Sequence, residues 1–234
     1  PGALDAIEKY MYTLPKPEDL PKETDGVTQL WYAVPESMLT PNYKTIVSLT
    51  RIEPDLHKSK GPEKIIIEGG PTEPEEFDED EFLKWLGIVA PQLKGKTTNG
   101  VFAPWAIFKK DFIELHGHDP LYKPQSREDS CIFNRMKLTG FKFVQVFEGL
   151  VYHFTSRGSR FQPLLTTPGI DSSEWIAHNK KSERNFNRKF GSDVCHDKYL
   201  HPIVRHKYNI GLVVHNMHPD YLILFEPKFA ACYV

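Results

Sequence analysis

The stretch of residues 126–154, SREDSCIFNRMKLTGFKFVQVFEGLVYHF, contains the helix and strand signals from which the predicted fold follows. Its first part has the signals of a helix over 126–139. Ser126 and Asp129 have the spacing of a capping box, in which two side chains bond to the free N–H groups at a helix start. Gly140 then suits the left-handed residue at which many helices end. The stretch therefore begins with a capped helix that ends sharply.

Two strands are expected after this helix, over 141–147 and 150–154, because β-branched and aromatic residues dominate both segments. Glu148-Gly149 is the expected turn between them. Strands and helices continue to alternate outward from this stretch. The expected strands are 45–49, 64–67 and 210–214, and the expected helices are 77–86, 109–115 and 173–190. Strands separated by helices indicate an α/β class, with a mixed sheet flanked by helices.

Composition narrows the class of protein. The chain has 234 residues, of which 40% are hydrophobic and 26% are charged, as in an ordinary globular protein with one large or two small domains. The formal net charge of −2 gives no overall basic field, which argues against nucleic acid as a partner. No apolar run reaches the ~18 residues that a transmembrane segment needs, and the N-terminus has no signal-peptide pattern. We therefore expect a cytoplasmic protein of unknown oligomeric state.

The three cysteines, Cys131, Cys195 and Cys232, are far apart and odd in number. This pattern favours reduced thiols over a disulfide framework. None of them belongs to a Cys-x-x-Cys pair, so the sequence does not predict a structural zinc site.

An ordered set of residues within 97–160 resembles a known family. Glu128-Asp129 opens a helix, Arg135 lies within it, a Gly-aromatic turn begins at Gly140, and a strand ends at His153. This order and spacing are similar to those of family 2 and related GT-A glycosyltransferases. The segment before it, 100–112, resembles the part of that family that shapes the acceptor pocket. The resemblance implies a GT-A-like α/β fold.

The resemblance also implies an activity and a set of roles. The family transfers a sugar from a nucleotide-sugar donor to a hydroxyl acceptor, here a glycan or another hydroxyl compound, with inversion and with Mn²⁺ or Mg²⁺. Asp129 would be the catalytic base, and Glu128 would bind an acceptor hydroxyl. His153 would be a metal ligand, and Arg157 and Arg160 would bind the diphosphate.

The chemistry of sugar transfer explains why these residue types are needed. A base must remove the proton of the acceptor hydroxyl, and positive charge must stabilise the departing diphosphate. A carboxylate on the first turn of a helix is held by backbone N–H groups, which suits a positioned base. Arginine binds phosphate through two parallel hydrogen bonds.

The sequence departs from the family at its start, where a nucleotide-binding half normally ends in an Asp-x-Asp metal motif. Ile7-Glu8-Lys9-Tyr10 stands in that place, and its lysine and tyrosine would not hold a divalent cation. The literal match, Asp78-Glu79-Asp80, is better interpreted as the solvated face of a helix whose apolar side carries Phe77, Phe82 and Trp85. We therefore divide the chain into a GT-A-like region without a recognisable nucleotide-binding start, 1–165, and a C-terminal α/β extension, 166–234. The apolar end of the chain favours a piece of a longer enzyme over a degenerate donor site.

Two alternatives remain open. The first is an inactive glycosyltransferase-like domain that binds glycans or another protein. The second is a metal-dependent hydrolase built on scattered histidines, either in His116-Gly117-His118-Asp119 or in Cys195-His196-Asp197 with His201. The first of these segments is interpreted more simply as a loop, and the second lacks the other half of a zinc site. The basic run 180–189 is interpreted as the solvated face of an amphipathic helix.

Overall fold

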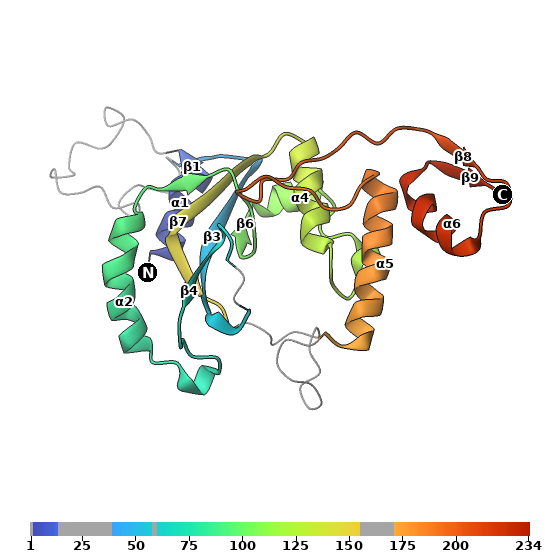
Figure 1. The fold of residues 1–234 in the computed structure, drawn as a ribbon. Coiled ribbons are helices and arrows are strands. Elements are labelled where there is room, and N and C mark those ends of the chain that lie inside the picture. The colour runs from blue at the N-terminus through green and yellow to red at the C-terminus, as the bar shows by residue number, and fades with distance from the viewer. Residues whose placement is uncertain (1, 14–38, 58–59, 155–170) are drawn as a thin grey trace. The chain divides into compact units, whose positions relative to one another are not determined.

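The computed structural model describes residues 2–13, 39–57, 60–154 and 171–234. The chain forms two compact units that alternate along the sequence. Unit 1 contains Pro1–Glu114 and Gly140–Thr155, and unit 2 contains Leu115–Thr139 and Ser156–Val234. The expected α/β class, with a mixed sheet flanked by helices, is confirmed (Figure 1). The functional division after residue 165 stays a prediction.

The sheet of unit 1 is built around β3 (Thr45–Pro54), which contains the expected strand 45–49. β4 (Lys64–Ile67) and β7 (Lys142–Tyr152) pair with β3 on either side, and both run parallel to it. β5 (Thr97–Thr98) pairs antiparallel with β7, and β6 (Trp105–Ala106) pairs antiparallel with β3. Nearly every residue of β3 is buried, as is typical of a central strand flanked by parallel neighbours.

Two of the helices of unit 1 and a short strand pair contribute to its packing. α1 (Ala3–Met11) packs on the sheet through a buried cluster of small and branched side chains, namely Ala6, Met11, Val47, Leu49, Val144 and Val146. β1 (Tyr12–Thr13) continues from α1 and pairs antiparallel with β2 (Thr40–Pro41). α3 (Lys109–Glu114) buries Asp111, whose carboxylate accepts a hydrogen bond from the backbone of Lys44 at 2.8 Å.

α2 (Glu79–Leu93) is longer than the sequence predicts, but its apolar side is the expected one. Asp78 is its N-cap, because its carboxylate accepts a bond from the backbone N–H of Glu81. The side chains of Glu79 and Asp80 are exposed, so the Asp-x-Asp match is a cap and a solvated face. Phe77 lies before the helix and packs on Phe82 at 5.2 Å between ring centroids, and Phe82 stacks on Trp85 at 6.1 Å.

The prediction of two strands joined at Glu148-Gly149 is wrong, because β7 continues through both residues. The register between β3 and β7 shifts there, so that Ser48 faces Gln145 but Thr50 faces Leu150. The hydroxyl of Thr50 donates to the carbonyl of Val146 at 3.1 Å within this irregular segment. The glycine is needed for close packing rather than for a turn. A Cβ on Gly149 would lie 2.5 Å from Leu49 Cδ2 and 3.0 Å from Val146 Cγ2.

Unit 2 is mainly helical. Its long elements are α4 (Glu128–Leu138) and α5 (Ser173–Phe190), and the bounds of α5 are those that the sequence predicts. A buried cluster holds the unit together, formed by Tyr122, Cys131, Phe186 and Phe190 with Val194 and Val204 packed against it. β8 (Gly211–Val213) and β9 (Ala231–Tyr233) pair in parallel around α6 (Pro219–Phe225). The three cysteines are free, as expected.

The capping box expected at Ser126 and Asp129 is wrong, because α4 begins at Glu128 and its N-cap is Arg127, which makes no side-chain cap bond. Ser126 and Arg127 both have left-handed backbone, with φ of 80° and 69°. The Ser126 hydroxyl instead donates to Asn179 on α5 at 2.6 Å. The hydroxyl that the local pattern assigned to the helix cap therefore makes a tertiary contact with α5 instead. The predicted ending is confirmed, since Gly140 has φ of 80°.

The basic run of α5 is less solvated than the sequence suggests. Arg184 and Arg188 both bond to the carboxylate of Glu226, at 2.7 Å and 2.8 Å, and Lys189 bonds to Asp119 at 2.7 Å. No helix in the described ranges is long and apolar enough to cross a membrane.

Replacing Gly149 with alanine should destabilise the protein, because the added methyl group has no room beside Leu49 and Val146. We expect the free energy of unfolding to fall by ~1–3 kcal/mol, the usual cost of an overpacked core. Gly87→Ala is the matched control. Gly87 lies within α2 and a Cβ there would contact nothing, so alanine should raise stability by ~0.5–1 kcal/mol. Urea unfolding measures both changes, and equal effects of the two substitutions would contradict this account of Gly149.

Candidate functional site

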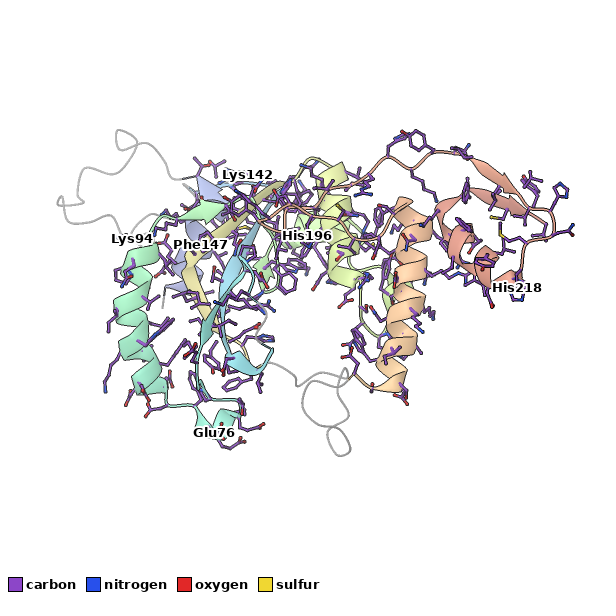
Figure 2. The ribbon with its side chains drawn as sticks, viewed as in Figure 1. Glu76, Lys94, Lys142, Phe147, His196 and His218 are labelled. Carbon is purple, nitrogen blue, oxygen red and sulfur yellow. The ribbon has the colours of Figure 1, made fainter. Side chains whose placement is uncertain are left out.

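The carboxyl ends of β3 and β7 bring Glu53 and His153 together. Ile52 faces Tyr152 in the parallel register, so the next residue of each strand extends beyond the paired region side by side. The backbone N–H of His153 donates to the carbonyl of Ile52 at 2.8 Å, which continues the pairing by one more bond. Lys142 and Phe147 mark the direction of β7 in Figure 2, which runs downward in that view towards this end of the sheet.

The imidazole of His153 is held by a buried carboxylate. Its Nδ1 lies 2.9 Å from Oε1 of Glu53, and Glu53 is only 4% exposed, whereas the His153 side chain is 46% exposed. An ionised carboxylate only accepts hydrogen bonds, so the proton of a neutral ring must be on Nδ1. The other nitrogen, Nε2, is then a lone-pair donor on the far side of the ring from Glu53. This arrangement prepares His153 to bind a metal ion or to accept a proton.

Two cations share the same carboxylate. Lys64, the first residue of β4, places Nζ 3.1 Å from Oε2 of Glu53, and Arg51 places a guanidinium nitrogen 3.3 Å from Oε1. Arg51 also bonds to Glu63 at 3.2 Å. We call the set Arg51, Glu53, Glu63, Lys64 and His153 the strand-end network. Four of its five side chains are largely buried, so its charges interact with little screening by solvent.

The network keeps Glu53 ionised. Burial by itself raises the pKa of a carboxyl, but the hydrogen bond from His153, the charge of Arg51 and the bond and charge of Lys64 outweigh it. Together they lower the pKa of Glu53 from 4.5 to about 2. Glu53 is therefore a fixed negative charge that orients His153 at any physiological pH.

The resemblance predicts that His153 lies at a strand end and binds a metal ion. The structure shows the strand-end position and the contacts of the ring there. In open α/β sheets, ligands bind in the crevice beyond the carboxyl ends of the strands. Histidines that bind metal ions commonly donate their other ring N–H to a carboxylate, as His153 does to Glu53. His153 thus has a partner suited to a metal ligand, although its predicted role remains a prediction.

Glu128 and Asp129 open α4 in unit 2, after the two left-handed residues Ser126 and Arg127. Left-handed backbone costs energy for residues other than glycine and is concentrated at functional sites. Burial and the charge of Asp129 raise the pKa of Glu128, against backbone hydrogen bonds and the charge of His118, which lower it. A raised pKa of this kind suits a group that exchanges protons. The resemblance assigns the base to Asp129 rather than to Glu128.

The two arginines predicted to bind the diphosphate, Arg157 and Arg160, lie outside the described residues. Glu128 and Asp129 belong to unit 2 and His153 belongs to unit 1, so their meeting in one catalytic site stays a prediction. Sequence reasoning missed Glu53, Arg51 and Lys64 entirely. The available signal was the pair of charged residues two positions apart at the end of an otherwise uncharged strand, Arg51-Ile52-Glu53.

The described residues contain no group of three histidine, cysteine or carboxylate side chains that could hold a metal ion. The histidine segments considered for a hydrolase form turns. Asp197 accepts bonds from the backbone N–H groups of Tyr199 and His201, and Asp119 bonds to Leu121 and Lys189.

Comparisons with known proteins give no further guide to this site. No family model, no curated protein and no solved structure matches the chain. The case for a function therefore depends on the residues and their geometry.

The lowered pKa of Glu53 predicts a specific loss of stability in acid. A carboxyl whose pKa is lowered by folding stabilises the folded state above its unfolded pKa, and this contribution is lost as the pH falls from about 4.5 towards about 2. The shift corresponds to ~3 kcal/mol at about 1.4 kcal/mol per pH unit. Lys64→Met removes one partner and should move acid unfolding to higher pH. The exposed Lys84→Met is the control, and circular dichroism during acid titration is the measurement. Coincident curves for the two variants would contradict the role of Lys64.

Proposed function

We propose that this chain is part of a glycosyltransferase that uses a nucleotide-sugar donor and a divalent metal ion, with His153 contributing to the binding of the metal–diphosphate group. The observation that carries the proposal is the bond between His153 Nδ1 and the buried Glu53 at the carboxyl ends of two parallel strands. The resemblance within 97–160 supplies the reaction class, and the strand-end geometry supplies a physical reason for the histidine.

The chemistry at this position follows from the network. Glu53 fixes the ring so that Nε2 has the lone pair, which is the form that binds a cation. When bound, a divalent metal would neutralise negative charge on a departing diphosphate. The protein residue that would hold the metal is His153, with Mn²⁺ or Mg²⁺ as the ion and diphosphate oxygens as further ligands.

The proposed base is one of the two carboxylates that open α4. Asp129 has this role in the resemblance, and Glu128 would bind the acceptor hydroxyl. The raised pKa of Glu128 favours a proton-transfer function for the pair, because a carboxyl with a raised pKa binds a proton closer to working pH. The acceptor remains a glycan or another hydroxyl compound.

Metal binding tests the role of His153. Calorimetry with Mn²⁺ and each common nucleoside diphosphate should give coupled binding, in which each ligand tightens the other. We expect His153→Ala to weaken it by at least ~10-fold, and Glu53→Gln by ~10-fold through loss of the anchoring charge. His215→Ala, at an exposed histidine of unit 2, is the matched control and should bind normally. Unchanged binding in His153→Ala would show that His153 does not bind the metal ion.

Turnover tests the carboxylate pair. Asp129→Asn preserves shape but removes basicity, so nucleoside diphosphate release from an active donor should fall by ~100- to 10,000-fold with donor binding intact. Glu174→Gln is the control, because Glu174 is also an acidic residue in the first turn of a helix, α5. If Asp129→Asn turns over as fast as the wild type, Asp129 is not the base. If the wild type transfers no sugar from any donor, the chain is better described as a glycosyltransferase-like binding domain.

A further inference from the structure

A second site in unit 1 lies beside the carboxyl ends of β4 and β7. It is a cavity of about 250 Å³ between the end of β4, the turn that follows it and the start of α2. Figure 2 labels Glu76, in the short turn Pro74–Glu76 that precedes α2 and borders this cavity, and Lys94 at the far end of the helix. None of its lining residues belongs to the strand-end network.

The walls of the cavity are aromatic. Phe77, Phe82, Trp85 and Tyr152 all line it. The ring of Phe77 lies 4.9 Å from that of Tyr152, and the ring of Phe82 lies 5.5 Å from it. Tyr152 uses its hydroxyl to donate to the carbonyl of Pro71 at 2.6 Å. The ring of Tyr152 therefore lines the cavity, while its hydroxyl is bonded to the turn after β4.

The charges around the cavity have one sign. Four carboxylates line it, namely Glu68, Glu76, Asp78 and Glu81, and no lysine, arginine or histidine does. Glu76 and Asp78 accept backbone hydrogen bonds that shape the turn and the start of α2. In the part of the chain that the structure describes, no cation forms an ion pair with Glu68 or Glu81. The cavity therefore combines aromatic rings with negatively charged side chains.

We propose that this cavity binds a small alkylammonium ion, with the cationic head against the aromatic rings and the carboxylates at its rim. Aromatic faces attract cations through the negative charge of their π systems, and tryptophan does so most strongly. The volume fits a head group of a few heavy atoms rather than a folded partner. The same carboxylates repel phosphate, so a nucleotide is disfavoured at this cavity. The inference is independent of sugar transfer.

Choline and its neutral isostere 3,3-dimethylbutan-1-ol test the proposal, because they have the same shape and differ in charge. Ligand-detected NMR titration should give choline an affinity at least ~5-fold higher than that of the isostere. Phe82→Leu retains apolar volume but removes a ring, and should weaken choline binding ~5-fold. Glu81→Gln should weaken it ~2- to 5-fold, as expected for an exposed charge.

Glu79→Gln is the matched control, since Glu79 lies between Asp78 and Glu81 in the sequence but does not itself line the cavity. Its choline affinity should equal that of the wild type. Thermal unfolding checks that Phe82→Leu is folded, and the exposed Glu81→Gln tests the charge without altering the core. Equal affinity for choline and its isostere, no binding of choline, or equal effects of Glu81→Gln and Glu79→Gln would each overturn the proposal.

Discussion

The buried carboxylate of Glu53 is the constraint on which the candidate site of unit 1 depends. Three groups bond to it, from β3 itself, from the start of β4 and from the end of β7. A charge in a poorly solvated position is costly unless it is paired and hydrogen-bonded. Glu53 meets both conditions only when the three parallel strands are in register. The same bonds that offset the cost of burying Glu53 therefore also fix the ring of His153.

This coupling explains why an exposed histidine can be well oriented. A side chain at a strand end ordinarily samples several rotamers, because little packs against it. In His153 the Nδ1 proton is committed to Glu53, which defines both the ring orientation and the tautomer. The aromatic cavity and this site use consecutive residues of the chain. Tyr152 lines the cavity, whereas His153 does not. Alternation along β7 thus gives two successive residues to two different environments.

Apolar runs, caps and glycines in the sequence were enough to predict several helices and strands. The bounds of α5, the strand at Thr45, the strand at Lys64 and the glycine stop after α4 could all be read from apolar runs, caps and glycine. Prediction failed where a distant residue decides the outcome. Ser126 bonds to Asn179 instead of capping α4, and Gly149 makes room for Leu49 instead of forming a turn.

The candidate site was only half predictable for the same reason. His153 could be found from its place at the end of a strand in an ordered set of residues. Glu53 was missed although Arg51-Ile52-Glu53 is a charged strand end, because its contact with His153 arises from the parallel pairing of β3 with β7, which joins residues a hundred positions apart. Glu128 and Asp129 could be identified from sequence as first-turn carboxylates. The strained backbone before them and the raised pKa of Glu128 depend on the folded environment of unit 2.

The tautomer of His153 is the sharpest test of whether Glu53 orients this ring. Long-range ¹H–¹⁵N NMR distinguishes the two ring nitrogens of a neutral histidine, and adding Mg²⁺ with a nucleoside diphosphate reports which nitrogen meets the ligand. If Glu53 orients the ring and His153 binds the metal–diphosphate group, neutral His153 has its proton on Nδ1 and the Nε2 resonance moves on ligand addition. A proton on Nε2, or an Nε2 resonance that is unchanged by the ligand, would contradict these roles of Glu53 and His153.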